Sequence, residues 1–208
     1  MTETEICVNS RGDGWVDVME LTEKLGTQCG LSKKERLRLR LLAEELIGML
    51  RGIAGDVEAV YRIEQENKSF QLHLDADVTM TQELRRQLLD VSTSGENLAA
   101  KGFMGKLREM IAIALLPKEG GVSLAKEFAL GLMSVAGNSS PNAQKASADA
   151  FNWSMNKYKD GVAAERENGR DESGSWDELE KSIVASLADE VRVSVKGSHA
   201  EIAIYKAF

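Results

Sequence analysis

Residues 32–78, SKKERLRLRLLAEELIGMLRGIAGDVEAVYRIEQENKSFQLHLDADV, contain two different hydrophobic periods, one after the other. The first part begins with Ser32 and Glu35, which have the spacing of a helix capping box. Apolar residues then recur every three or four positions, as on one face of a helix. These residues are Leu39, Leu42, Leu46, Leu50 and Ile53. The pattern predicts a helix over about 33–53.

From Val57 onward the hydrophobic period changes to two, which is typical of a β-strand with one buried face. The polar residues 66–69 (ENKS) separate two such runs and can form a turn. The sequence therefore predicts a β-hairpin directly after the helix. Its alternating residues are Val57, Ala59, Tyr61 and Ile63 before the turn, and Phe70, Leu72 and Leu74 after it, with His73 between the two leucines.

The same two periods predict the elements on either side of this segment. The chain should begin with a short strand around Ile6 and Val8 and end with a second β-hairpin, whose strands contain Val191 to Val195 and Ala200 to Ile204. A charged, glycine-rich stretch over 160–175 is expected to be a mobile loop. The remaining elements are helices, expected at about 15–27, 81–89, 104–116, 122–135, 142–160 and 176–188.

The strands fall into two hairpins and one single strand, with helices grouped between them. This order favours an α+β fold, in which a two-layer sandwich has helices on one face of a mixed sheet. We expect one domain over 1–208, with 92–175 as a helical insertion or an extended lid. A Rossmann fold is disfavoured, because the middle strands are joined by a hairpin and no G-x-G-x-x-G motif follows a strand.

The composition excludes several classes of function. The chain has 208 residues and a net charge of −7, which disfavours binding to nucleic acid, because phosphate contacts need clustered Lys and Arg. The longest apolar run, 110–116, is far shorter than the roughly 20 residues of a membrane span. The two cysteines form no disulfide framework, and no signal segment opens the chain. We therefore expect a cytoplasmic protein without a membrane partner.

Few residues are candidates for catalysis. The two histidines, His73 in a predicted strand and His199 in a predicted turn, are too few for a metal cluster or a Ser-His-Asp site, so no metal site is predicted. Both are interpreted as structural residues. Cys7 and Cys29 have no basic neighbour that would favour a thiolate, and we interpret them as inert.

Two adjacent glutamates in the helix predicted over 33–53 differ in their position around the helix axis. Glu44 lies almost opposite the leucine stripe and should be solvated, whereas Glu45 lies on the border of the stripe, about one turn from Met49. A carboxylate at such a border can hydrogen-bond or activate a water at the rim of a pocket. The alternative is an amphipathic helix with ordinary surface acids.

The order of elements over 1–90 and 176–206 resembles the ATP-binding domain of the GHKL superfamily, the Bergerat fold of gyrase-type topoisomerases, histidine kinases and anti-sigma-factor kinases. The closing helix and hairpin resemble the anti-sigma-factor kinase branch most. The resemblance implies that Glu45 is the catalytic glutamate of the family. Met49 then stands where the family has the asparagine that coordinates magnesium, so ATP is implied as a ligand but Mg²⁺ is in doubt.

The resemblance also implies nucleotide-binding residues. Asp75 matches the aspartate that accepts the adenine amino group, and Asp77 and Thr79 replace the two glycines of the Asp-x-Gly-x-Gly motif. The phosphate-binding helix start has two candidate positions. The first comprises Gly102, Gly105 and Lys106, and the second is the segment 182–185, which contains no glycine.

Two hypotheses for function follow. The first is an ATP-binding regulatory domain that acts on a protein partner in intracellular signalling. The second is a non-enzymatic interaction module on the same scaffold, in which Met and aromatic residues of the helices between 104 and 160 form a groove or a homodimer face, unless they are core. These residues are Met104, Met110, Phe128, Met133, Phe151, Trp153, Met155 and Tyr158.

Overall fold

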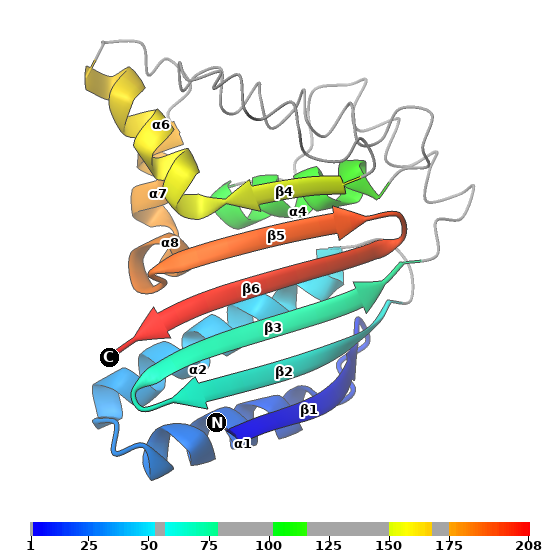
Figure 1. Cartoon of the computed structure of the whole chain (residues 1–208), viewed down its shortest axis with the longest axis vertical. Coiled ribbons are helices and arrows are strands. Elements are labelled where there is room, and N and C mark those ends of the chain that lie inside the picture. The colour runs from blue at the N-terminus through cyan, green and yellow to red at the C-terminus, as the bar shows by residue number, and fades with distance from the viewer. Residues whose placement is uncertain (1, 53–56, 79–101, 116–149, 168–174) are drawn as a thin grey trace.

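The computed structural model describes residues 2–52, 57–78, 102–115, 150–167 and 175–208. Six strands form one sheet in the order β1-β2-β3-β6-β5-β4, and every pairing between them is antiparallel (Figure 1). The two predicted hairpins are β2 with β3 and β5 with β6, and they lie side by side because β3 pairs with β6. The strands are β1 (Thr2–Asn9), β2 (Glu58–Glu66), β3 (Ser69–Asp77), β4 (Ala150–Ser154), β5 (Glu190–Lys196) and β6 (His199–Ala207).

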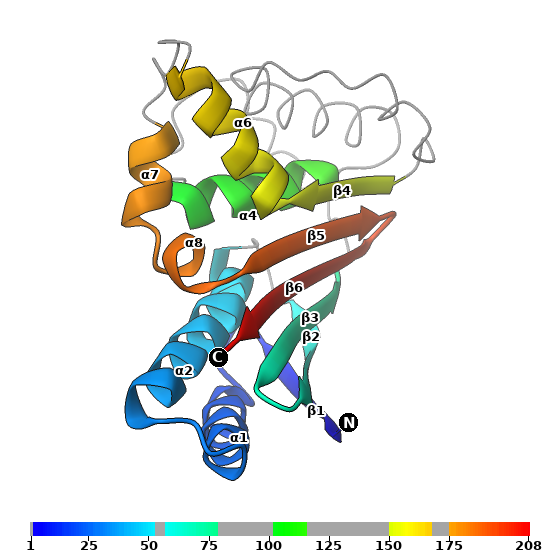
Figure 2. The same ribbon diagram turned by 60° about the vertical axis from the view of Figure 1, so that its left-hand side comes forward.

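Helices form a second layer on one face of the sheet (Figure 2). Helix α1 contacts β1 and β2, α2 contacts β3 and β6, and α4 contacts β5, while α7 and α8 pack on α4 and α2. The expected α+β fold, with helices covering one face, is confirmed. The helical elements are α1 (Trp15–Gln28), α2 (Lys33–Gly48), the 3-10 helix η1 (Met49–Gly52), α4 (Gly102–Ala114), α6 (Met155–Glu167), α7 (Ser175–Lys181) and α8 (Ile183–Leu187).

The sheet is antiparallel in its described pairings, so the expectation of a mixed sheet is wrong in this respect. The reason is the pair of helices between the first two strands. Helices α1 and α2 run in opposite directions and return the chain to the end of the sheet where β1 stops. The next strand must then run back along β1, and Asn9 accordingly pairs with Glu58.

The region expected to be a helical insertion contributes a strand to the sheet. Phe151 and Trp153 point into the core from β4, which pairs with β5, so the helix predicted over 142–160 is wrong at 150–154. Phe151 has helical spacing to Met155, Tyr158 and Val162, which are three buried residues of α6. The helical period of α6 therefore continues backward through the residues of β4, so the sequence pattern predicts a helix where the structure has a strand.

Two other boundaries differ from the prediction. The loop expected over 160–175 is helical up to Glu167, with Val162 fully buried. The last predicted helix is divided into α7 and α8, because Ser182 has an extended backbone and caps α8. Thr79 and the helices predicted at 81–89 and 122–135 lie outside the described residues.

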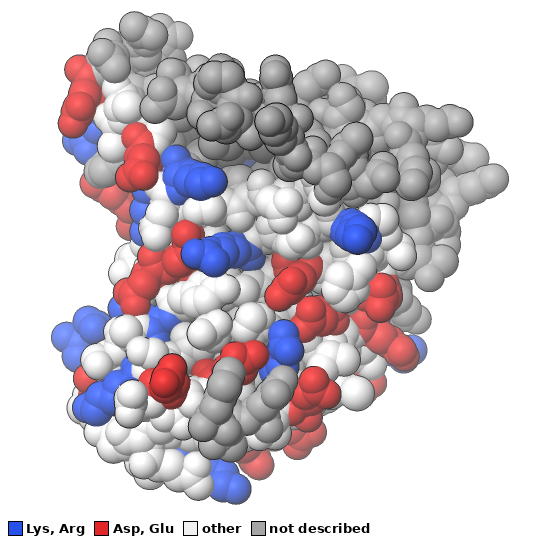
Figure 3. Space-filling view, viewed as in Figure 1, with Lys and Arg blue, Asp and Glu red and all other residues white. Residues whose placement is uncertain are grey.

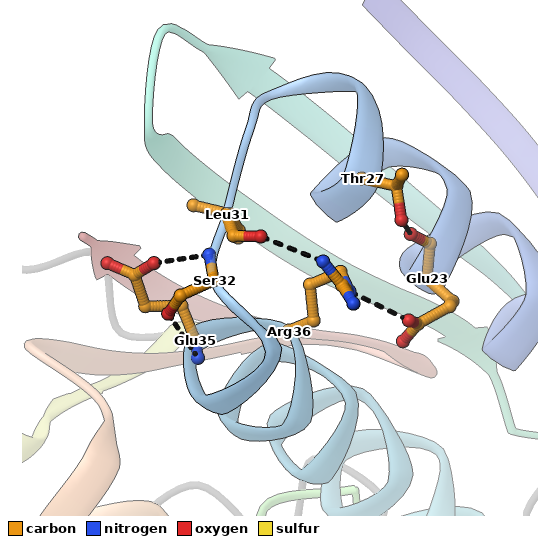
Figure 4. Close-up of polar contacts among 6 residues, drawn as sticks. All are labelled: Glu23, Thr27, Leu31, Ser32, Glu35 and Arg36. Atoms are coloured by element: carbon orange, nitrogen blue, oxygen red, sulfur yellow. Dashed lines mark hydrogen bonds and ion pairs between the residues drawn. The ribbon is translucent and has the colours of Figure 1, made fainter.

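The helix α2 is held at its start by the capping box that the sequence predicts. Ser32 Oγ accepts a hydrogen bond from the Glu35 amide, and Glu35 accepts one from the Ser32 amide (Figure 4). Arg36 then joins α2 to α1 by donating to Glu23 and to the Leu31 carbonyl, both at 2.9 Å. These contacts fix the orientation of α2, whose apolar stripe is fully buried at Leu39, Leu42, Leu46 and Ile47.

Within the described ranges, none of the helices has the length and hydropathy needed to cross a membrane.

Candidate functional site

Glu45 and Met49 lie on α2 and η1, in the helix layer. Glu45 is half-buried and Glu44 is exposed, as their positions around the helix predict. Met49 is 1% exposed, and its neighbour Leu50 is completely buried. The position that would hold a magnesium ligand in the family therefore faces apolar core.

Asp75 does not share a space with Glu45. Residues of β3 alternate between the two faces of the sheet, and Leu74 and Ala76 are buried on the side of the helices. Asp75 therefore points to the opposite face, where its carboxylate lies 3.9 Å from Arg62 Nη2 and 3.7 Å from His199 Nε2. The sheet separates the two residues that the resemblance assigns to one nucleotide pocket.

The other implied nucleotide residues are also divided between the two faces. Asp77 is on the face of Asp75, 80% exposed, and its carboxylate contacts His199 Nδ1 at 3.2 Å. Gly102, Gly105 and Lys106 begin α4, in the helix layer, and Gly105 is buried there. Between them, Phe103 packs into an aromatic cluster on α4, β4 and α6, with centroid distances of 5.8 Å to Trp153 and 6.1 Å to Tyr158.

The alternative phosphate segment, 182–185, starts the short helix α8. Ser182 Oγ accepts a hydrogen bond from the Ala185 amide at 3.2 Å, so the side chain caps the helix itself. The carbonyl of Ala185 in turn accepts a bond from Lys159 Nζ at 2.7 Å. Burial lowers the pKa of Lys159, and the carboxylates of Glu190 and Asp189 offset part of this effect.

The face of the sheet opposite α1, α2 and α4 is called the open face below, and Figure 3 shows it with its charged side chains. Both histidines of the chain lie on it, each between two carboxylates. His73 Nε2 is 3.9 Å from Glu64 and its Nδ1 is 3.4 Å from Glu201. His199 similarly lies between Asp75 and Asp77. We call these four carboxylates, Glu64, Asp75, Asp77 and Glu201, the acidic cluster.

His73 is the most buried polar side chain of this group, with 8% of the side chain exposed. Neither of its ring nitrogens makes a hydrogen bond, although carboxylates lie near both. A buried polar group without a hydrogen bond costs free energy. The interpretation of His73 as an ordinary structural residue does not account for this arrangement.

The strand register explains how the network forms. In the antiparallel pairing, His73 lies opposite Arg62 on β2 and opposite Ala203 on β6, while Asp75 lies opposite Glu201. Arg62 contacts both Glu64 and Asp75 at 3.9 Å. Residues from three strands are therefore placed within reach of one another by pairings that the linear sequence does not state. The alternation around Leu72 and Leu74 in the sequence does indicate that His73 faces away from the helices.

A groove with a volume of about 630 Å³ lies beside the acidic cluster, between β6, β5 and β4 and the first turns of α6. Its lining includes Tyr205, with Arg192 placed 5.0 Å above the ring centroid, and Lys157 on α6. Glu190 holds the start of α6 by accepting bonds from Ser154 Oγ and the Asn156 amide. The lining of the groove therefore contains two cationic side chains, Lys157 and Arg192, and three carboxylates, Asp160, Glu190 and Glu201.

The residues proposed from sequence as an interaction face are core residues in the structure. Phe151, Met155 and Tyr158 are at most 2% exposed, and Trp153 is 7% exposed. The groove or dimer face expected from these side chains is therefore wrong for these four and for Met110, which is 2% exposed, while Met104 is partly buried against the same core. Phe128 and Met133 lie outside the described residues.

The comparisons with protein families, curated proteins and solved structures give no match for this chain. In the part of the chain that the structure describes, His, Cys, Asp and Glu side chains form no group of three suited to a metal ion.

Proposed function

We propose that this protein is a non-enzymatic interaction module whose element order resembles a histidine-kinase-like ATPase domain but whose described residues form no nucleotide pocket. The supporting observation is the burial of Met49 in apolar core. A triphosphate with its metal ion needs polar ligands, and placing phosphate against apolar side chains without them is costly.

The helix side of the sheet at the end of β3 agrees with this proposal. Ala76 and, just after the strand, Val78 are buried there, with 4% and 3% exposed. Neither side chain can accept a hydrogen bond from an adenine amino group. The aspartate that could do so, Asp75, is on the other face of the sheet.

One observation favours the second candidate, an ATP-binding regulatory domain. Glu45 is half-buried at the border of the α2 stripe, which suits a carboxylate at a pocket rim. That candidate requires Glu45 to act on a nucleotide that has no magnesium ligand at Met49 and no adenine contact from Asp75. We therefore rank it below the interaction module.

Isothermal titration calorimetry of the whole chain with ATP and ADP, with and without Mg²⁺, tests the proposal. We expect no binding at millimolar nucleotide. Saturable binding that Glu45→Gln weakens and Asp75→Asn leaves unchanged would overturn the proposal and support the ATP-binding candidate. A cooperative urea transition of each protein shows that a negative result comes from folded material.

A further inference from the structure

The open face carries an excess of acidic side chains over its middle strands. Figure 3 shows these acids gathered in the middle of the face, over the strands that Figure 1 labels β2, β3 and β6. The acidic cluster has four carboxylates, and Arg62 is the one Lys or Arg among its described ionic contacts. Four carboxylates beside one guanidinium give this group an excess of acidic side chains. Such a surface attracts cationic groups and repels other acidic surfaces.

His73 provides an independent indication that this surface receives a ligand. Its side chain is more than nine-tenths buried, and both ring nitrogens face the cluster without a hydrogen bond. Buried imidazoles normally have a partner for at least one nitrogen. The ring nitrogens themselves are closed off from solvent, so a donor supplied by another molecule would bond to the neighbouring carboxylates, Glu64 and Glu201.

We propose that the open face docks an extended segment of a partner protein that carries Lys or Arg side chains at alternate positions. This inference rests on the proposed function, because it names the surface and the partner class of the interaction module. Asp75 and Asp77 are two residues apart on β3 and so point to the same side about 7 Å from each other. An extended chain presents alternate side chains at the same spacing, so two cations can meet both carboxylates.

The neighbouring groove continues the same surface. Its lining combines the cations Arg192 and Lys157 with the carboxylates Asp160, Glu190 and Glu201, and Glu201 also belongs to the acidic cluster. The Lys or Arg side chains of the partner belong over the acidic cluster, where four carboxylates face one guanidinium, whereas other residues of the same segment can extend toward Tyr205.

A second copy of this chain is a poorer occupant of the same surface. In a two-fold symmetric dimer, a patch that lies on the symmetry axis contacts its equivalent in the other copy. A dimer centred on the acidic cluster would therefore place the two clusters against each other, and like charges in such a contact oppose association. A separate, basic partner avoids this repulsion.

The test uses the whole chain and a fluorescein-labelled peptide that alternates lysine with serine, with an equivalent glutamate-serine peptide as reference. Binding is measured by fluorescence anisotropy at about 50 mM salt, where screening is modest. The double variant Asp75→Asn/Glu201→Gln removes two carboxylates from the open face. The matched control, Glu20→Gln/Glu44→Gln, removes the same charge from exposed positions of α1 and α2.

We expect the lysine peptide to bind and the glutamate peptide not to bind. The open-face variant should weaken binding about tenfold, which corresponds to the loss of two exposed or half-exposed ion pairs, while the control stays within about twofold. Equal weakening by both variants, or no binding by the unmodified chain, would overturn the inference. Dimerisation in sedimentation that only the open-face variant abolishes would also overturn it, because the occupant would then be a second copy.

Failure of this inference is separable from failure of the proposed function. If neither nucleotide nor peptide binds, only the assignment of the open face fails. If nucleotide binds with the mutational pattern described above, the interaction module itself is refuted, whatever the peptide does.

Discussion

Replacing Met49 with asparagine introduces the residue that the resemblance to the ATP-binding family implies at this position. The Met49 side chain is 1% exposed and belongs to the main hydrophobic core. Removing this side chain from the core loses about 2 kcal/mol of hydrophobic stabilisation. Placing an amide there without hydrogen-bond partners costs about 1–3 kcal/mol more. We therefore expect Met49→Asn to lower the free energy of unfolding by about 3–5 kcal/mol, a large part of the 5–15 kcal/mol typical of domains.

The assay is urea unfolding followed by circular dichroism, with the unmodified chain and Met49→Leu as controls. Leucine has a similar volume and no polar group, so it should cost less than about 1.5 kcal/mol. If the variants show the same m-value, the slope of the unfolding free energy against urea concentration, they unfold between similar states and their stabilities can be compared directly. The same proteins are then titrated with ADP and Mg²⁺.

The reasoning would be refuted if Met49→Asn cost less than about 1 kcal/mol and also bound ADP in a Mg²⁺-dependent way. That result would mean that the side chain at this position reaches solvent or a polar pocket, in contrast to its burial in the structure. A large loss of stability without nucleotide binding supports the packing argument.

Three further predictions concern the parts that hold the site. Ser32→Ala should lower the free energy of unfolding by about 1 kcal/mol, because it removes half of the capping box of α2, whereas Lys33→Ala beside it should have little effect in urea unfolding. Phe103→Ala should cost about 3–5 kcal/mol in the same assay, because it leaves a cavity beside Trp153. The pKa of Asp189 is below its ordinary value: burial opposes ionisation, but hydrogen bonds from Lys206 and the Ala207 amide outweigh it. Its stabilisation is therefore present above the unfolded pKa of about 3.9 and lost as the pH falls through the lower folded pKa. Asp189→Asn should cost about 1 kcal/mol at pH 7 and progressively less as the pH is lowered through the acid range.

The helical and alternating periods predict most of the described elements because they depend on neighbouring residues. The capping box and leucine stripe place α2 correctly, and the alternation places both hairpins. The prediction fails at β4, where Phe151 continues the helical spacing of Met155 and Tyr158. Only the pairing with β5 distinguishes a strand there, and that pairing is a long-range contact.

The predicted site residues show a related difference. A match of residue types assigned Asp75 to the adenine position, but alternation along β3 puts Ala76 on the helix side and Asp75 on the open face. The burial of Met49 against core follows from the packing of η1 and could not be read from its place in a motif.

The sequence by itself determined the local elements, the α+β class and the grouping of helices between strands, since each depends on spacings within a few residues. The tertiary structure decided which side chains meet. Asp77 and His199 are 122 positions apart, yet they are neighbours because β3 pairs with β6 in one particular register. A shift of that register by one residue would turn one set of side chains to the other face. The histidine and carboxylate network on the open face therefore exists only in the folded sheet.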